Sequence, residues 1–205
     1  MVQRNPTAGI ILAAGESTRL GRPKQLLRLK DKYLLEWVLD ASLNSTLSKI
    51  VLVLGYAHQK ILKALQEKLQ HPKIEIEVNP DFKKGQSQSL RVGLSKVKDD
   101  FAAVMFLLAD QPMMDSATIN LLLENFHAAG KDICAPTHRG KRKNPTIFSH
   151  RFYSQLMSIS GDIGARKLID ENPERVLTVE IDNSLSFFDV DTQKDFRQLK
   201  ELMSQ

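Results

Sequence analysis

The sequence has little of several features that mark particular classes of protein. Cys134 is the only cysteine among 205 residues, which excludes an intramolecular disulfide and a cysteine-rich zinc site and fits a reducing cytoplasm. Cys134 lies in an apolar run, which favours a buried, unreactive thiol over a nucleophile. No run of about 18 apolar residues is present, and nothing at the start of the chain resembles a signal peptide. We therefore expect a cytoplasmic protein without a transmembrane helix.

Aromatic residues make up only 6% of the chain, which leaves little stacking material for single-stranded nucleic acid. The net charge of +5 suits an anionic substrate, and nucleic acid is the alternative partner. Because the basic residues are scattered, we expect no nucleic acid and no membrane among the partners. The histidines form no i, i+4 pair, and no G-x-S-x-G motif is present, so neither a histidine metal site nor a serine hydrolase is indicated.

Apolar segments with strand character alternate with segments of helical period along most of the chain. Strands are predicted at residues 10–14, 49–54, 74–78, 102–108, 132–135, 145–148 and 176–181. Helices are predicted at 33–47, 58–69, 87–97, 116–129, 149–157, 161–171 and after Thr192. This alternation predicts an α/β fold with a mostly parallel central sheet, and the length favours one domain.

The first polar segment after a predicted strand combines small residues, hydroxyl groups and cations. Gly15 allows close approach of a ligand to the backbone, and Arg19 and Lys24 supply fixed positive charge for phosphates. The segment has neither the P-loop spacing nor the G-x-G-x-x-G fingerprint. A phosphate-binding loop and an ordinary strand-to-helix loop with solvated charges are both compatible with this spacing.

Carboxylates follow two further predicted strands, at the sheet edge where α/β proteins bind ligands. Asp110 comes directly after an apolar run and could hold Mg²⁺ together with substrate phosphates; a turn or capping role is the alternative. Asp189 and Asp191 point to the same side of an extended segment. We favour a metal role for Asp191, with the alternative that it only leads into the helix capped by Thr192, and an ordinary role for Asp189.

Three weaker segments have simple structural explanations. Residues 85–89 could contact a base or ribose, but a helix start capped by Ser87 is the favoured explanation for this segment alone. The basic stretch 138–145 is by default a solvated loop; recruitment of a phosphorylated acceptor is the sharper hypothesis and nucleic acid a third. Residues 161–166 fit a helix start capped by Asp162.

In this order, however, the segments resemble a known family. Residues 12–24, LAAGESTRLGRPK, resemble the signature L-A-A-G-x-S-x-R-[ML]-G-x-x-K of the MobA-like nucleotidyltransferases. GQSQSL (85–90), LADQP (108–112), Asn144-Pro145, GDIGAR (161–166) and DVDT (189–192) continue the resemblance over nearly the whole chain. The LADQP and GDIGAR motifs are typical of the molybdenum cofactor cytidylyltransferase branch.

The resemblance implies a single MobA-like NTP transferase domain over residues 1–205, with the Rossmann-like three-layer α/β/α fold of the nucleotide-diphospho-sugar transferases. It implies Mg²⁺-dependent transfer of CMP from CTP to the phosphate of molybdopterin, with release of pyrophosphate. The implied catalytic residues are Arg19, Lys24 and Asp110, and the implied metal ligands are Asp110 and Asp191. The implied nucleotide-binding residues are Leu12, Ala13, Ala14, Gly15, Arg19, Lys24, Gly85, Ser87, Ser89 and Asp110. The implied acceptor-binding residues are Asn144, Asp162 and Arg166.

Several alternatives stay open. The same family includes guanylyltransferases that use GTP with the same cofactor, and enzymes whose acceptor is a sugar phosphate. A non-catalytic protein that delivers the cofactor to a molybdoenzyme is a further hypothesis, and transient contact with a molybdoenzyme or its chaperone is expected of the enzyme too. Two positions depart from the branch: Lys143 replaces a glycine, and Gln193 replaces a proline. The first bears on the identity of the acceptor.

Overall fold

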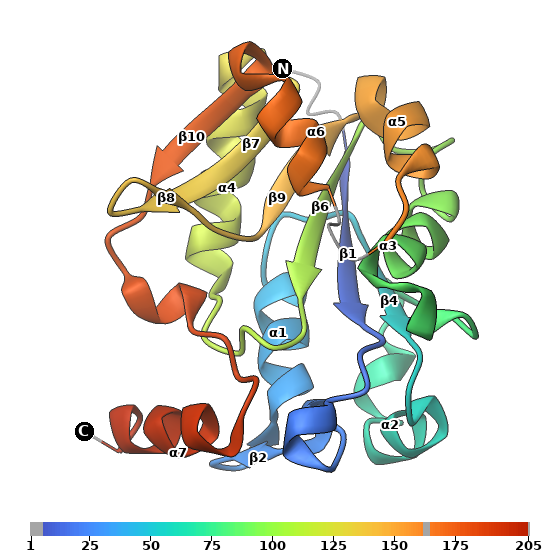
Figure 1. Ribbon diagram of the computed structural model, residues 1–205, viewed down its shortest axis with the longest axis vertical. Coiled ribbons are helices and arrows are strands. Elements are labelled where there is room, and N and C mark those ends of the chain that lie inside the picture. Colours follow the sequence, from blue (N-terminus) through green and yellow to red (C-terminus); the bar gives the residue numbers. More distant parts are fainter. Residues whose placement is uncertain (1–5, 162–164, 205) are drawn as a thin grey trace.

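The computed structural model describes residues 6–161 and 165–204, and its centre is one mostly parallel sheet (Figure 1). The strand order is β10-β7-β9-β6-β1-β4-β5, with β8 paired to β7. The bounds are β1 (Thr7–Ala13), β4 (Lys49–Leu54), β5 (Ile74–Val78), β6 (Ala103–Leu108), β7 (Ile133–His138), β8 (Lys141–Arg142), β9 (Thr146–Ser149) and β10 (Val176–Glu180). Strands β8 and β9 pair antiparallel with their neighbours, and the other pairings in this sheet are parallel. The mostly parallel sheet predicted from the sequence is confirmed.

Helices cover both faces of the sheet, which gives the three-layer α/β/α architecture. One face packs against α1 (Leu34–Leu43), α2 (His58–Ala64) and α4 (Ser116–Ala129), and the other against α3 (Gln86–Ser95), α5 (Tyr153–Ser158) and α6 (Arg166–Glu171). Successive residues of β1 separate the two layers, since Ile11 packs in the first cluster and Ile10 in the second. Both are fully buried, as expected for a parallel strand covered on both faces.

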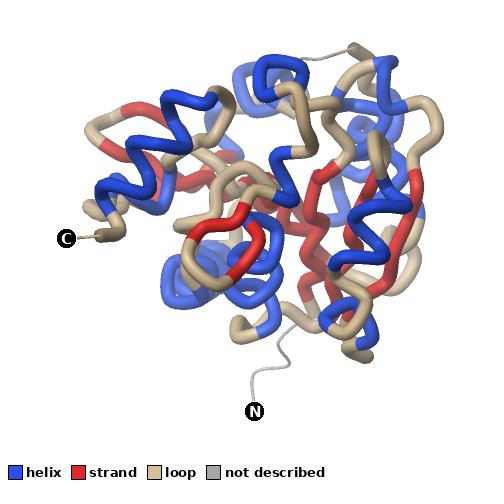
Figure 2. The backbone as a smooth tube through the Cα atoms, turned by 90° about the horizontal axis from the view of Figure 1, so that it is seen from below, coloured by secondary structure: helices blue, strands red, loops and turns tan. Residues whose placement is uncertain are grey.

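A third apolar cluster lies beyond the carboxyl ends of β1 and β6, at the bottom of Figure 1. There α7 (Gln193–Leu202) packs against the hairpin of β2 (Arg28–Leu29) and β3 (Lys32–Tyr33), with Leu29, Val190 and Phe196 in the contact. Figure 2 looks onto this end of the molecule, with α7 beside the C-terminus. The cluster joins the segment after β1 to the segment that carries Asp189 and Asp191.

Several local predictions are confirmed and several are wrong. The predicted cap of α7 by the Thr192 side chain is confirmed. The helix predicted at 116–129 is also confirmed, with Asp115 as its N-cap and Gly130, at φ +63°, at its end. Ser87 does not cap α3, because Gly85 holds the N-cap position and the Ser87 hydroxyl has no partner within the described residues. The two longer helices predicted at 33–47 and 58–69 are shorter, ending at Leu43 and Ala64.

The remaining differences concern short elements. Strands of two residues, such as β2, β3 and β8, are too short to produce an alternating pattern, so the sequence predicted loops there. Leu65 and Leu69 are buried although α2 ends before them. Leu65 directly follows the last turn of α2, with its N–H donating to Ile61 O, and Leu69 lies in a 3₁₀ turn over Lys68–Gln70. Within the described residues, none of the helices combines the length and apolar character needed to cross a membrane.

Candidate active site

The predicted loop segments meet where the order of strands in the sheet reverses. From β1 the chain moves to β4 and β5 on one side, and then returns to β6 on the other side of β1. The carboxyl ends of β1 and β6 therefore flank the point where α/β sheets bind ligands. A cavity of about 370 Å³ opens there. It is lined by Leu12, Ala13, Ala14, Gly15, Glu16, Lys24, Gln25, Phe82, Lys83, Gly85, Gln86, Ser89, Leu108, Ala109 and Asp110.

The loop after β1 is closed by its own hydrogen bonds. The Ser17 hydroxyl accepts a hydrogen bond from the backbone N–H of Lys24 at 3.0 Å, and a 3₁₀ turn over Thr18–Leu20 lies between them. Gly21 ends that turn with φ +65°. A Cβ at Gly15 would meet no atom within 4 Å, so the space beside this glycine is open to a ligand. The loop therefore returns to the carboxyl end of β1, where Lys24 lines the same cavity as Leu12 to Gly15.

Lys24 joins two carboxylates that are far apart in the sequence. Its Nζ donates to Asp110 Oδ2 at 2.6 Å and to Asp191 Oδ1 at 2.8 Å. Burial alone would lower the pKa of Lys24, but the charge of Asp110 and the hydrogen bonds to both carboxylates raise it above its ordinary value. Arg19 lies outside the cavity with 68% of its side chain exposed, 3.6 Å from Asp191.

A third carboxyl, Asp189, belongs to the same group. Its Oδ1 accepts a hydrogen bond from Gln111 Nε2 at 2.9 Å. Burial and the charge of Asp110 raise the pKa of Asp189, against the opposing effect of the Gln111 hydrogen bond. The sequence favoured an ordinary role for Asp189 and gave none to Gln111, although Gln111 stands inside the LADQP motif that carried the resemblance.

The start of α3 forms another wall of the cavity. Gly85 and Ser89 line it, and the Ser89 hydroxyl accepts a hydrogen bond from Asn79 Nδ2 at 2.9 Å. Ser87 is buried and does not line the cavity; its backbone N–H donates to Gly161 O at 3.2 Å. The GQSQSL and GDIGAR motifs therefore touch through their backbones.

The predicted acceptor residues are not assembled in the same way. Asn144 is half-buried and precedes Pro145 through a cis peptide bond, and Arg166 is exposed at the start of α6. Asp162 lies outside the described residues. Across the described part of the chain, no hydrogen bond or ion pair joins Asn144 or Arg166 to Lys24 or to the three carboxylates.

Seven residues that line the cavity were not among the predicted site residues: Glu16, Gln25, Phe82, Lys83, Gln86, Leu108 and Ala109. Of these, Gln25, Phe82 and Lys83 lie outside the motifs that carried the resemblance. Glu16 and Lys83 form an ion pair at 3.7 Å between the loop after β1 and the segment before α3. Phe82 lies 6.4 Å from the ring of Tyr56, which follows β4. Phe82 and Lys83 lie within three residues of Gly85, where the GQSQSL motif begins, so extending that motif by three residues toward the N-terminus would have included them. No pattern in the sequence singled out Gln25.

The donor set fits a hard divalent cation held by two protein carboxylates. Among the described residues, no group of three His, Cys, Asp or Glu side chains is arranged to hold a metal. Asp110 and Asp191 nevertheless converge on one cation, the Lys24 ammonium, and Asp110 Oδ1 is buried with no hydrogen-bond partner in the part of the chain that the structure describes. Mg²⁺ and its relatives commonly take one or two carboxylates and complete their shell with phosphate oxygens and water.

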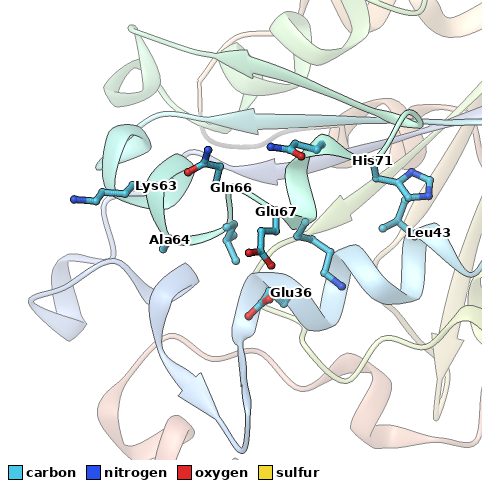
Figure 3. A pocket seen from close by; sticks show the side chains of 10 residues that line it. Glu36, Leu43, Lys63, Ala64, Gln66, Glu67 and His71 are labelled. Carbon is cyan, nitrogen blue, oxygen red and sulfur yellow. The ribbon is translucent and has the colours of Figure 1, made fainter.

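A larger cavity of about 880 Å³ lies elsewhere, between α1 and the segment 63–71 (Figure 3). Glu36 of α1 faces Glu67 across it, and Lys63 and His71 lie at its two ends. Its lining residues include none of the residues predicted from the sequence to act in the site. The smaller cavity is the candidate site because it alone of the two gathers the signature loop, Lys24 and Asp110.

Known proteins resemble the chain over nearly its full length. The purine catabolism protein PucB of Bacillus subtilis is 28% identical over 202 residues, which cover 96% of this chain and 97% of that protein. The nicotine blue oxidoreductase of Paenarthrobacter nicotinovorans is 28% identical over 204 residues, which cover 93% of this chain and 95% of that protein.

Solved structures also resemble the chain over nearly its full length. Rv0371c of Mycobacterium tuberculosis superimposes with a TM-score of 0.83 at 30% identity, covering 96% of this chain and 98% of that one. A complex of the same protein with manganese superimposes with a TM-score of 0.80 at 28% identity and the same coverage. The molybdopterin-guanine dinucleotide biosynthesis protein A of Archaeoglobus fulgidus, at 17% identity, 97% and 98% coverage and a TM-score of 0.68, shares the fold.

The family itself is given by a match of residues 9–176 to the MobA-like NTP transferase domain. That range contains the loop after β1, the start of α3, Asp110 and the hairpin of β7 and β8. The chain is therefore a nucleotidyltransferase of the MobA-like NTP transferase family.

Proposed function

We propose that the protein transfers CMP from CTP to the terminal phosphate of a molybdopterin-type acceptor and releases pyrophosphate, with Mg²⁺ as the metal. The observation that carries the proposal is the convergence of Asp110 and Asp191 on Lys24, where Lys24 and Asp110 line the cavity formed by the signature loop. Lys24 and Arg19 would neutralise the triphosphate. Leu12 to Gly15 and the start of α3, with Gly85 and Ser89, would hold the nucleotide; buried Ser87, which the sequence had placed in this group, does not reach the cavity.

The reaction needs no nucleophile from the protein. An oxygen of the acceptor phosphate attacks the α-phosphorus of the nucleotide, the new O–P bond forms in line, and the bond to pyrophosphate breaks. An acceptor phosphate is already ionised near neutral pH, so a general base is unnecessary. Catalysis then comes from positioning and from stabilising charge.

Asp110 and Asp191 would hold the metal, and Asn144, Asp162 and Arg166 would lie on the acceptor side. A bound divalent cation supplies Lewis-acid stabilisation of the charge on the phosphates. The hydrogen bonds from Lys24 Nζ to Asp110 and Asp191 support this assignment, because they bring one cation and two carboxylates together. With the nucleotide bound, Lys24 would bind oxygens of the triphosphate. The product would pass to a molybdoenzyme or to its chaperone by transient contact.

The test of the reaction measures pyrophosphate release with CTP, GTP, ATP and UTP, each in the presence of molybdopterin and Mg²⁺. We expect CTP to give the highest kcat/KM. A preference for GTP would replace the cytidylyl reaction by the guanylyl reaction with the same cofactor. Release only with a sugar phosphate as acceptor would overturn the molybdopterin assignment.

Tight nucleotide binding without turnover would instead support a protein that delivers the cofactor.

Removing the central charges should abolish most of the activity. We expect Lys24→Ala and Asp110→Ala each to lower kcat/KM by more than about a hundredfold, because each removes a charge contact to the transition state. Lys98→Ala is the matched control, since Lys98 is exposed and pairs only with the neighbouring Asp99 among the described residues. Wild-type rates of pyrophosphate release in either site variant would exclude that residue from the mechanism.

A further inference from the structure

Gln25 is a buried amide directly behind the loop that we propose to bind phosphate. It is only 1% exposed and lies in the 3₁₀ turn Lys24–Leu26, next to the lysine that joins the carboxylates. Its Nε2 donates to Ala13 O at 2.7 Å and, at 3.5 Å, to Gly15 O. Its Oε1 is buried with no hydrogen-bond partner among the described residues. Because both neighbours on one side of the amide are carbonyl acceptors, the nitrogen of the Gln25 side chain must face them and the oxygen must face away.

These two bonds complete a regular arrangement of the loop backbone. Leu12 O accepts from Ala109 N at 3.2 Å, and Ala14 O accepts from Tyr56 N at 3.1 Å. Together with the Gln25 bonds to the carbonyls of Ala13 and Gly15, four consecutive carbonyls are held by protein donors. Gln25 is the one side chain that supplies such donors, since Ala109 and Tyr56 use their backbone.

The amides of the same loop remain available. Within the described residues, the backbone N–H groups of Gly15 and Glu16 donate to no protein acceptor. Both residues line the cavity. Because carbonyls drawn toward the protein leave amides to face the ligand, successive N–H groups in such a turn can bind an anion.

We propose that Gln25 is a positioning residue: its side-chain amide holds the carbonyls of Ala13 and Gly15 so that the loop amides bind the phosphates of the nucleotide. This inference rests on the proposed function and deepens it. The cost of an unpaired, buried Oε1 is consistent with a residue retained for what its nitrogen does rather than for stability. The same turn presents Lys24, so one short segment sets both the cation and the amides that face the triphosphate.

The test uses Gln25→Met, which nearly preserves side-chain volume and removes both the donor and the unpaired oxygen. We expect the dissociation constant for inorganic pyrophosphate, measured by calorimetry, to rise at least tenfold. The KM for the nucleotide should rise by a similar factor with a smaller change in kcat, and Tm should change by no more than about 4 °C. Gln70→Met, at an exposed position, is the matched control and should bind pyrophosphate as the wild type does.

A measurement on the wild type keeps the inference testable if Gln25→Met does not fold. In ¹H–¹⁵N spectra, added pyrophosphate should shift the amides of Gly15 and Glu16 and the side-chain N–H₂ of Gln25. Unshifted signals at saturating pyrophosphate, or unchanged affinity in a folded Gln25→Met, would overturn the positioning role and leave the proposed reaction intact. Absence of pyrophosphate release with every nucleotide would instead overturn the reaction, while the pyrophosphate titration would still test Gln25.

Discussion

At the scale of single residues, the Lys24 ammonium occupies the position between Asp110 and Asp191 where we propose a divalent cation. Its side chain is 13% exposed, and its distances of 2.6 and 2.8 Å leave no room for a second cation between the same oxygens. Metal binding would therefore require Lys24 to move toward the phosphates of the nucleotide. Without nucleotide, the ammonium and the metal would compete for the two carboxylates.

This competition predicts opposite effects for two substitutions. Lys24→Met should bind Mn²⁺ about tenfold more tightly than the wild type without nucleotide, because it leaves two like charges uncompensated at short range. Asp191→Asn should bind Mn²⁺ more weakly, because it removes one of the charges. Electron paramagnetic resonance of free Mn²⁺ measures both affinities, with Lys98→Met as the control. Weaker binding by Lys24→Met would contradict the competition, and unchanged binding by Asp191→Asn would move the second ligand to Asp189.

At the scale of elements, α3 is held unusually close to the sheet. A Cβ at Gly93 would lie 2.4 Å from Ile10 Cγ2 and 3.0 Å from Val53 Cγ2, both in buried strands. The first turn of α3 forms a wall of the candidate site, with Ser89 lining the cavity. The absence of a side chain at Gly93 thus sets the distance between that wall and β1.

Gly93→Ala should therefore be destabilising, although alanine is the better helix former. We expect a loss of about 1–3 kcal/mol in the free energy of unfolding, because the added methyl group must displace β1 or α3. Urea denaturation measures this loss. Gly15→Ala is the matched control and should keep wild-type stability, since its Cβ would meet nothing within 4 Å. A Gly93→Ala protein as stable as the wild type would show that α3 can move away from the sheet.

The sequence predicted which of the longer segments form strands, but not the direction in which each strand runs. The runs at β6 and, after Lys49, at β4 are apolar throughout, which marks strands buried on both faces. The strand β5 alternates because Ile74 and Ile76 pack on the first apolar cluster, while Glu75 and Glu77 form partly exposed ion pairs with lysines. The antiparallel direction of β9 was not predictable, because local periodicity does not record which neighbour a strand pairs with. The segments of the site were found because polar residues follow strands in α/β folds.

The contacts within the site depend on distant parts of the chain. Lys24 and Asp191 are 167 positions apart in the sequence. The packing of α7 on the β2–β3 hairpin and the hydrogen bond from Val190 N–H to Asp110 O, at 2.9 Å, bring the two segments together. Gln25 was not predicted for a related reason. Its hydrogen-bond partners are backbone carbonyls, and every residue has one, so the sequence does not show which carbonyls Gln25 contacts. Sequence patterns thus identified groups that carry charge, and the structure added the groups that orient them.

At the scale of the whole molecule, the candidate chemistry and a major stabilising cluster lie at opposite ends of the sheet. Asp132 precedes β7 at the amino end, and its carboxylate accepts hydrogen bonds from Ser149 Oγ at 2.8 Å and from Arg175 Nε and Nη2 at 3.0 and 2.7 Å. The Arg175 guanidinium also lies 4.8 Å from the centre of the Phe152 ring. These contacts join β7, β9 and β10 far from Lys24, so stability and activity should be separable.

The variant Asp132→Asn tests whether stability and activity are separable, through the pH dependence of the free energy of unfolding. Burial alone would raise the pKa of Asp132, but the hydrogen bonds from Ser149 and Arg175 and the nearby Arg151 charge lower it below its ordinary value. A lowered pKa in the folded state stabilises the protein above the ordinary pKa of the carboxyl, and this contribution is lost as the pH falls through the lowered value. Since the side chain is 12% exposed, we expect Asp132→Asn to cost roughly 1.5–3 kcal/mol at pH 7, from its charged hydrogen bonds. The difference in free energy of unfolding between Asp132→Asn and the wild type should become smaller below about pH 4, while pyrophosphate release at 25 °C stays unchanged. Denaturation curves recorded from pH 7 to pH 3 measure this difference. A difference that stays constant over that range would exclude the ionised carboxylate as the source of the lost stability.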